Sequence, residues 1–435
     1  MGDIRAPSVS EGTTFGGRRG HLTIEVIWSH KWIGIRDAAT QLVPFARRST
    51  AGGRCDTLAG MARVLFTSCP AFGHFLPMLP LIRAAERAGH DVRIATGPDL
   101  VEFLAIRGLD VHAVGPTWGE AWSAHEVVWA NPGLPEEQKM MEGVVALFGR
   151  PAVARLADLV VMAQEWRPDI VVHEVLESAG SLLARRLGVP GVVHGIGPMF
   201  PFYAQLIGTT GVAIGEPELW EQASSEQALD LCPPSLRPDG PPPWPTAVPL
   251  QPSAGEPGQV PPAVADVLLA DRPIAYFTLG TVKNTDAADF ATGLTALERY
   301  EGVVVATTGR RLGPDKLGPV PANAVVAEFV PQASLLERAD LLVSHSGSGT
   351  MLGGLVQGLP QVALPRGTDQ PANAALLTRV GAGVVVAPED YSVATIRAAV
   401  AEVTGNPTFR RAAERVRDEI AAMPSAETVW AGISV

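Results

Sequence analysis

The sequence has little of what membrane-spanning, secreted or nucleic-acid-binding proteins require. No apolar run in its 435 residues approaches the length of a membrane span. Its three cysteines, Cys55, Cys69 and Cys232, are odd in number and far apart. This argues against a disulfide framework and a zinc site, and suits a reducing cytoplasm. The net charge is −11 and no basic stripe appears, so we expect no nucleic-acid partner.

Two further absences concern cofactors. The sequence has no Asp-x-Asp triplet and no cluster of His and Cys residues that would indicate a bound metal. Its first strand–helix–strand pattern lacks the G-x-G-x-x-G fingerprint of dinucleotide-binding proteins. We therefore expect neither a metal nor a resident cofactor.

Residues 1–60 differ from the rest of the chain. They show no sustained helical or strand period, and they lack the apolar core and cleavage site of a signal peptide. We interpret them as a disordered extension, or as sequence upstream of a true start at Met61. A targeting segment or an arm for a partner is the alternative.

The length of the remaining chain fits two ordinary domains. Residues 61–232 predict an N-terminal domain, and residues 263–417 predict a C-terminal domain followed by a last helix in residues 418–435. Residues 233–262 between the domains are crowded with proline. They predict an extended linker without a packed core of its own.

The N-terminal domain opens with a strand, a loop that turns into a helix, and a second strand. The two strands are predicted at residues 63–67 and 91–96. A later strand, at residues 168–174, ends in the polar pair His173 and Glu174. Residues 116–150 are rich in Trp, Met and Phe, which are either core residues or walls of an apolar acceptor pocket; the sequence favours neither.

The most informative stretch lies in the C-terminal domain. Residues 341–343 predict a buried parallel strand, and small or polar residues follow from Ser344 to Thr350. Apolar residues at helical spacing then continue to Val356. Small residues at a helix start leave backbone N–H groups uncovered, and these groups with the helix dipole favour a phosphate.

The next strand and loop repeat this arrangement. Residues 361–364 predict another short strand, and Asp369 and Gln370 follow it at the start of a further helix. Ligands of open α/β sheets bind outside the carboxyl ends of the strands. Carboxylate and amide groups there can accept and donate hydrogen bonds to sugar hydroxyls.

This stretch resembles the nucleotide-sugar signature of family 1 glycosyltransferases of the GT-B fold, above all of bacterial enzymes that glycosylate antibiotics and macrolides. The matching features are Pro331-Gln332, the loop from His345 to Thr350, Gly358 to Pro360, and Asp369-Gln370 with Asn373. In the first domain, Gly73-His74-Phe75-Leu76-Pro77 resembles the first loop of the same enzymes. The resemblance implies an α/β protein with two Rossmann-like domains that face each other across a cleft.

The resemblance also implies roles for individual residues. His74 matches the catalytic base of the family, and Glu174 matches its acidic partner, where many relatives have Asp; His173 could contact substrate instead. The residues expected to bind the donor are Gly280, Thr281, Val330, Gln332, His345, Ser346, Gly347, Ser348, Gly349, Thr350, Asp369 and Gln370. The residues expected to bind the acceptor are Phe72, Trp118, Trp122, Met199 and Phe200.

These features predict an inverting, metal-independent glycosyltransferase. It would move a sugar from a uridine or thymidine diphosphate sugar to a hydroxyl of a small, largely apolar natural product. A nucleotide-sugar epimerase of the same fold is one alternative, and a non-catalytic protein that activates another glycosyltransferase is a second. A Gly-His loop together with Asp-Gln is what a transferase needs, and an activating protein would be expected to lose the base or the phosphate loop. We expect a cytoplasmic protein, and a homodimer stays open.

Overall fold

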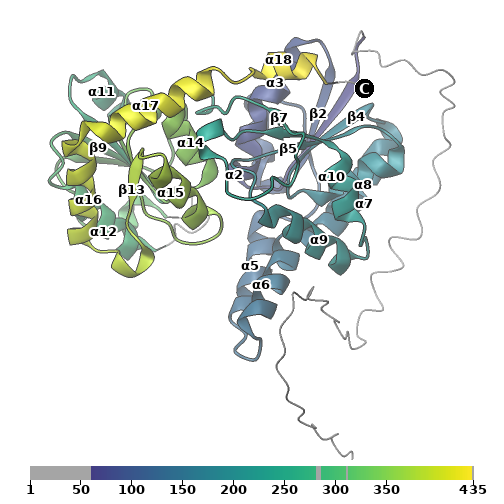
Figure 1. Cartoon of the computed structure of the whole chain (residues 1–435), viewed down its shortest axis with the longest axis horizontal. Helices are drawn as coiled ribbons and strands as arrows, with labels where there is room; N and C mark the ends of the chain where they lie inside the picture. The colour runs from purple at the N-terminus through teal and green to yellow at the C-terminus, as the bar shows by residue number, and fades with distance from the viewer. Residues whose placement is uncertain (1–59, 281–285, 310–311, 434–435) are drawn as a thin grey trace, which may run out of the picture. The chain divides into compact units, whose positions relative to one another are not determined.

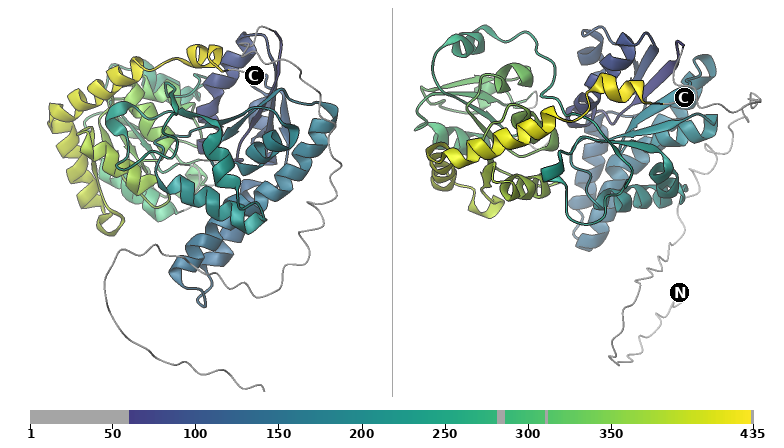
Figure 2. Two further views of the ribbon diagram at one scale, coloured as in Figure 1. Left: turned by 45° about the vertical axis from the view of Figure 1, so that its right-hand side comes forward. Right: turned by 45° about the horizontal axis from the view of Figure 1, so that its top comes forward.

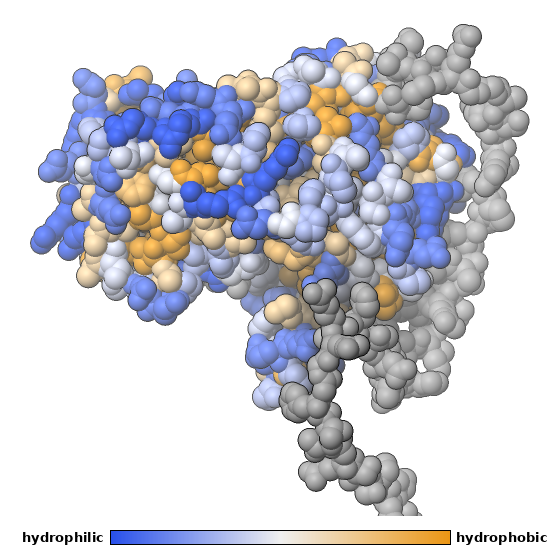
Figure 3. All heavy atoms as spheres, viewed as in Figure 1, coloured by the Kyte–Doolittle hydropathy of each residue, from blue (hydrophilic) through white to orange (hydrophobic). Residues whose placement is uncertain are grey.

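The computed structural model describes residues 60–280, 286–309 and 312–433 (Figure 1). The predicted extension, residues 1–60, lies outside this part of the chain except for Gly60, and so does Thr281. Among the described helices, none combines the length and the apolar character needed to cross a membrane. Hydrophilic and hydrophobic residues alternate over the face seen in Figure 3.

Seven parallel strands form the sheet of the N-terminal domain, in the order β3-β2-β1-β4-β5-β6-β7. They are β1 (Arg63–Thr67), β2 (Asp91–Thr96), β3 (Val111–Ala113), β4 (Ile170–Glu174), β5 (Gly191–His194), β6 (Gln227–Asp230) and β7 (Val248–Pro249). Strands β1 and β2 have the predicted bounds. Strand β4 is buried along its whole length, as expected for an apolar parallel strand covered by helices.

The helices of this domain lie between the strands in the chain. They are α2 (Phe72–Phe75), α3 (Leu79–Arg87), α4 (Pro98–Ala105), α5 (Trp118–Trp129), α6 (Glu136–Val144), α7 (Arg150–Glu165), α8 (Ser178–Leu187), α9 (Phe202–Ile214) and α10 (Leu219–Ser225), with short turns η1 (Leu76–Met78), η2 (Val145–Gly149) and η3 (Pro234–Leu236). Helix α3 buries Leu79, Leu81, Ile82 and Ala85, the predicted apolar face.

Six parallel strands form the sheet of the C-terminal domain, in the order β10-β9-β8-β11-β12-β13. They are β8 (Ile274–Thr278), β9 (Val303–Thr307), β10 (Ala324–Ala327), β11 (Leu341–Ser344), β12 (Gln361–Ala363) and β13 (Gly383–Val385). The helices are α11 (Pro262–Leu269), α12 (Ala287–Leu297), α13 (Gln332–Leu336), α14 (Ser348–Val356), α15 (Gln370–Arg379), α16 (Val393–Gly405), α17 (Pro407–Ala421) and α18 (Ala426–Ala431), with turns η4 (Pro314–Lys316) and η5 (Pro388–Asp390).

Both sheets confirm the predicted Rossmann-like α/β class. In each sheet the strand order reverses beside the first strand, between β1 and β4 and between β8 and β11. Such switch points open a crevice at the carboxyl ends of the strands, where ligands of this fold class bind. His74, Glu174, Gly280 and the loop from His345 to Thr350 lie at or just after the ends of these four strands. The other predicted site residues follow β3, β5, β10 and β12.

The first half of the predicted linker belongs instead to the N-terminal domain. Strand β7 pairs with β6, and the side chain of Trp244 is 3% exposed, with its Nε1–H donating to the carbonyl of Ala223 at 2.8 Å. Leu250 is also buried. The proline-rich composition misled the prediction because proline is tolerated in a sheet at an edge strand, which is the position of β7.

The end of the chain contacts the N-terminal domain, as the resemblance implied. The yellow segment in Figure 2 contains α17 and then the short helix α18. Trp430 of α18 packs on Phe66 of β1 and on His90, with ring centroids 6.3 and 5.3 Å apart. The predicted terminal helix is therefore divided: α17 ends at Ala421, and α18 alone makes these contacts.

Candidate active site

The carboxyl ends of β1 and β4 bring His74 and Glu174 together. The two strands are paired in parallel with Thr67 opposite His173, so the loop after β1 and the last residue of β4 meet at one edge of the sheet. His74 lies in the short helix α2 that ends this loop. Its Nδ1 is 3.0 Å from Oε2 of Glu174, whose side chain is completely buried. The structure thus joins two residues that are one hundred positions apart in the sequence.

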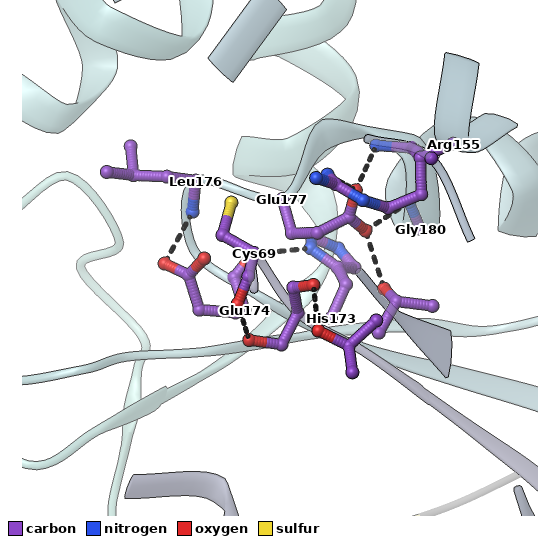
Figure 4. Close-up of polar contacts among 12 residues, drawn as sticks. Cys69, Arg155, His173, Glu174, Leu176, Glu177 and Gly180 are labelled. Carbon is purple, nitrogen blue, oxygen red and sulfur yellow. Dashed lines mark hydrogen bonds and ion pairs between the residues drawn. The ribbon is translucent and has the colours of Figure 1, made fainter. Parts of the chain in front are cut away.

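The contact with Glu174 favours the charged form of His74. Burial lowers the pKa of the imidazole, but the charge and hydrogen bond of the Glu174 carboxylate outweigh burial, so the pKa of His74 is raised from its usual value. Oε1 of Glu174 accepts a hydrogen bond from the backbone N–H of Leu176 at 2.9 Å, which fixes the carboxylate (Figure 4). In the neutral ring, a proton on Nδ1 would face Glu174 and leave the lone pair on Nε2.

A second carboxylate holds the surrounding elements together, and sequence reasoning missed it. Glu177 caps the N-terminus of α8 and accepts from the Thr67 hydroxyl at 2.6 Å, tying α8 to β1. It also pairs with the buried guanidinium of Arg155 on α7 at 2.8 Å (Figure 4). A Cβ on Gly180 would lie 2.3 Å from the Thr67 hydroxyl oxygen, so only glycine fits at this position.

His173 does not reach into the site. Its Nε2 pairs with Oε2 of Glu226 at 2.6 Å, and the ring is buried. Burial lowers the pKa of His173, but the Glu226 charge outweighs it and the pKa is raised. The alternative that His173 contacts substrate is therefore wrong, because its ring is held inside the domain.

Aromatic side chains cover one side of His74. The ring of Trp118 lies 5.7 Å from the imidazole, centroid to centroid, and Phe148 lies 6.0 Å from it. Trp122 stacks on Trp118 at 6.2 Å. Phe148 belongs to the aromatic-rich stretch of the sequence but was not among the predicted acceptor residues. The apolar wall beside His74 is thus formed by α5 and the turn η2.

Phe72 lies in a different aromatic group from Trp118. Its ring packs edge-on against Phe103 of α4 at 4.8 Å and is 6.5 Å from Phe329, which follows β10 in the C-terminal domain. Phe72 and His74 are close in the sequence, but both lie in α2, where side chains two positions apart point in different directions. Phe72 therefore packs between elements of the two domains, away from the ring pair that His74 makes with Trp118.

Met199 and Phe200 lie in the segment after β5, close to the loop of the donor domain. A Cβ on Gly197 would be 2.4 Å from Cβ of Ser348, so this segment contacts the start of α14. Phe200 stacks on Phe202 at 5.1 Å. Both Met199 and Phe200 are buried. The segment is thus placed where the acceptor and donor halves of the site meet.

The loop after β11 is held by a network of polar side chains. The Ser348 hydroxyl donates to Oδ2 of Asp369 at 2.8 Å, and the amide of Asn373 donates to the same oxygen at 2.9 Å and to the carbonyl of Ser346 at 3.1 Å. Ser346 has a φ of 60°, in the left-handed region that is costly for a residue with a Cβ. Asn373 therefore stabilises the strained turn before α14, a role the sequence did not show.

His345 forms no ion pair with a carboxylate in the part of the chain that the structure describes, unlike His74. Burial lowers the pKa of His345 to about 4, so the ring is neutral at pH 7, and its Nδ1 has no hydrogen-bond partner among the described residues. The ring packs against the backbone of Gly280 and Gly347: a Cβ at either position would lie 2.5 Å from Nε2. A neutral imidazole between two glycine backbones can donate one hydrogen bond to an anion.

The other predicted donor residues differ in what they offer. Gly347 is the N-cap of α14, and Gly349 and Thr350 lie in its first turn, where backbone N–H groups are unpaired within the helix. Val330 packs into the apolar cluster around Leu335 and Leu342, so only its backbone is available. Gln370 accepts from the backbone N–H of Arg366, and the side-chain amide nitrogen of Gln332 is buried with no partner in the described residues.

Among the residues that the structure describes, one group of side chains could hold a metal ion. Cys69, His74 and Glu174 each offer a ligand atom, and these atoms all lie within 4.8 Å of one another. The sequence pattern did not reveal this group, because its members lie far apart in the chain and meet only at the β1–β4 edge; the expectation of no metal stays a prediction.

The fold and the site define a GT-B glycosyltransferase: two Rossmann-like domains, a His–carboxylate pair at the edge of the first sheet, and a helix N-terminus with a His at the edge of the second. Residues 83–243 and 291–433 match the N-terminal and C-terminal domain models of the family described as erythromycin biosynthesis protein CIII-like. The chain belongs to this family.

Known proteins of similar sequence and structure agree. The chain is 32% identical to L-demethylnoviosyl transferase of Streptomyces niveus, with 86% of this chain and 97% of the relative covered. It is 27% identical to erythronolide mycarosyltransferase of Saccharopolyspora erythraea, covering 84% and 97%. The structure superposes with a TM-score of 0.67 on a Streptomyces sp. SF2575 glycosyltransferase complexed with thymidine diphosphate, at 26% identity and covering 85% and 98%. The epimerase and auxiliary alternatives are not supported.

Proposed function

We propose that this glycosyltransferase moves a sugar from a thymidine diphosphate sugar to a hydroxyl of a small, largely apolar natural product, with inversion and without a metal. The observation that carries the proposal is the 3.0 Å contact of His74 with a fully buried Glu174 beside an aromatic wall. Thymidine is favoured over uridine because a solved relative holds thymidine diphosphate. The names of the relatives support an antibiotic-like acceptor.

The acceptor half of the site supplies the base. Nε2 of His74 takes the proton of the acceptor hydroxyl as its oxygen attacks the anomeric carbon. Glu174 holds the ring in the required tautomer and stabilises the imidazolium that forms, as the acidic member of a triad does. Trp118, Trp122 and Phe148 exclude water from this side of the ring and bind apolar acceptor surface.

The donor half stabilises the leaving group. As the bond from the anomeric carbon to the diphosphate breaks, its electron pair goes to the diphosphate oxygen. The neutral His345 ring and the free N–H groups at the start of α14 donate hydrogen bonds to the growing charge. These groups do the work that a divalent cation does in metal-dependent transferases. Attack from the acceptor side, opposite the diphosphate, inverts the anomeric centre.

Two measurements test the proposal. A panel of thymidine and uridine diphosphate sugars is screened by thermal shift, since a ligand that binds the native state raises its melting temperature. We expect thymidine nucleotides to give the larger shifts. The sugar that binds is then incubated with an apolar polyketide or aromatic acceptor, before and after exhaustive EDTA treatment.

The product decides the mechanism. We expect EDTA-resistant transfer, with an anomeric configuration opposite to that of the donor by NMR. Retained configuration would overturn the displacement mechanism, and activity that requires added magnesium or manganese would overturn metal independence. Sugar isomerisation without transfer would restore the epimerase alternative.

A further inference from the structure

Cys69 lies beside the His74–Glu174 pair, and the mechanism proposed above gives it no task. It follows β1 in the loop that leads to His74, and its side chain is 1% exposed. Burial raises the pKa of the thiol well above its usual value, and the nearby Glu174 carboxylate raises it further. Cys69 is thus a protonated thiol against the carboxylate that orients the base (Figure 4).

We propose that Cys69, His74 and Glu174 form an inhibitory site for a thiophilic divalent cation such as zinc. The three residues offer the sulfur, nitrogen and oxygen donors that zinc takes in proteins. One ligand atom from each lies within 4.8 Å of the others. Tetrahedral coordination with bonds of ordinary length puts its ligand atoms roughly 3.4 Å apart. Nδ1 and Oε2, now 3.0 Å apart, would separate by a few tenths of an ångström, and a sulfur separation near the 4.8 Å limit would close by roughly 1 Å.

The charge and the access of the site suit a cation. Nδ1 of His74 and Oε2 of Glu174 are buried without a well-formed hydrogen bond among the described residues, so metal binding disrupts little at these two atoms. The hydrogen bond of the Cys69 thiol to Glu174 would give way to bonds to the metal. The nearest guanidinium, that of Arg155, is paired with Glu177 at 2.8 Å, which offsets its repulsion. His74 is 16% exposed, so the ring forms the open side of the cluster. With three protein ligands, the fourth position is left to water.

The proton balance explains why binding would inhibit. The Cys69 thiol loses its proton to solvent and the sulfur binds the metal as a thiolate. The metal takes the place of the proton on Nδ1 of His74, and that proton moves to Nε2. The ring is then in the tautomer that cannot accept the proton of the acceptor hydroxyl. The enzyme would therefore need no metal for transfer, and a metal bound at this site would lower its activity. This part of the inference rests on the proposed function.

Cobalt binding tests the site without any assay of activity. The EDTA-treated, dialysed full chain is titrated with Co²⁺, and the thiolate-to-cobalt charge-transfer absorption is recorded. We expect the band in the wild type and in Cys232→Ala, which removes the other described buried cysteine, and in Cys55→Ala. We expect no band in Cys69→Ala or in Cys69→Ser, the second variant keeping the size of the side chain in case Ala disturbs the fold. A missing band in the wild type, or a band that survives both Cys69 substitutions, would overturn the site.

Zinc inhibition tests the consequence. We expect zinc to inhibit transfer by the wild type and by Cys232→Ala, and EDTA to restore it. Cys69→Ser should remain active without metal and should need at least roughly tenfold more zinc for the same inhibition, because loss of a ligand costs at least as much affinity as loss of an outer partner. Equal zinc sensitivity of Cys69→Ser and wild type would refute the inhibition. A chain with no transferase activity at all would refute the proposed function while the cobalt titration still decides on the site.

Discussion

The two domains each place a histidine at the carboxyl end of a parallel strand, and the two histidines are in opposite electrostatic surroundings. His74 faces a buried carboxylate at 3.0 Å, and its pKa is raised. Among the described residues His345 makes no ion pair; burial lowers its pKa to about 4, against the weaker opposing effect of the Asp369 charge. The fold thus positions the same side chain twice, and the neighbours decide the chemistry. A ring whose cation is stabilised can take a proton, and a ring held neutral can only donate a hydrogen bond.

The largest expected effect is on the base. His74→Ala should lower the rate of glycoside formation by roughly 10²–10⁴-fold, the usual worth of a general base. Donor affinity, measured by calorimetry, should stay near wild type because the donor residues belong to the other domain. His112→Ala removes a half-buried histidine that pairs with Asp110 on the same sheet; it is the matched control and should leave transfer unchanged. Near-normal turnover of His74→Ala would remove this residue from the mechanism, unless the acceptor ionises on its own.

The second-largest effect on the transfer rate is expected for the neutral histidine, His345. His345→Ala should slow transfer by about 10²–10³-fold, on the order of 3 kcal/mol, because one hydrogen bond to the leaving diphosphate is lost where charge grows. Its effect should appear in kcat measured at saturating donor, and the acceptor KM should change little. Donor kinetics identical to those of the wild type would make His345 a packing residue for Gly280 and Gly347.

Replacing Glu174 by Gln should lower the pKa of His74 and so make it resemble His345. In Glu174→Gln the carboxylate charge is gone, so the burial that lowers the pKa of His74 would be opposed only by the smaller effect of the Asp369 charge. The acid limb of the kcat/KM profile, which reports protonation of the base in the free enzyme, should move to lower pH than in the wild type. The maximal rate should fall less than in His74→Ala. An unchanged or upward-shifted acid limb would show that Glu174 does not set the charge of the base.

The smallest effect concerns the wall beside the base. Trp118→Ala removes the ring beside His74 on which the proposed acceptor would pack; one aromatic contact is worth about 1 kcal/mol, so the acceptor KM should rise roughly fivefold. Trp129→Ala, at the end of the same helix and 39% exposed, provides the control. If both variants raise the acceptor KM alike, the effect comes from helix α5 as a whole and not from a pocket at His74.

The features that were predictable depend on residues close together in the chain. Strands β1, β2, β8 and β9 follow from short apolar runs, and the loop before α14 follows from its string of small residues. The contacts that were missed join residues far apart: the Thr67 and Glu177 side chains meet over a separation of 110 residues. No local period marks such a pair. The same holds for Cys69, whose importance appears only when β1 and β4 lie side by side.

The predicted linker, residues 233–262, shows what composition alone fails to predict. Composition alone suggested an unpacked segment, whereas a buried Trp244 and strand β7 assign its first half to the N-terminal domain. Proline lacks the backbone N–H that pairs with a neighbouring strand. An edge strand has a neighbour on one side only, so it tolerates proline and can still pack against the domain. Isolated aromatic residues such as Trp244 within the proline-rich stretch were the signal for packing.

The route of the C-terminus has a consequence for domain exchange between related enzymes. Trp430 and Ile433 are buried, and Trp430 packs on Phe66 of the first domain although it is encoded at the far end of the gene. A hybrid joined once, at the boundary between the halves, would place one parent's terminal helix on the other parent's strand β1. Such a hybrid needs two junctions. The first lies between Leu250 and Pro262, after β7 and before α11, and the second lies between α17 and α18. The terminal helix α18 then comes from the same parent as the N-terminal domain.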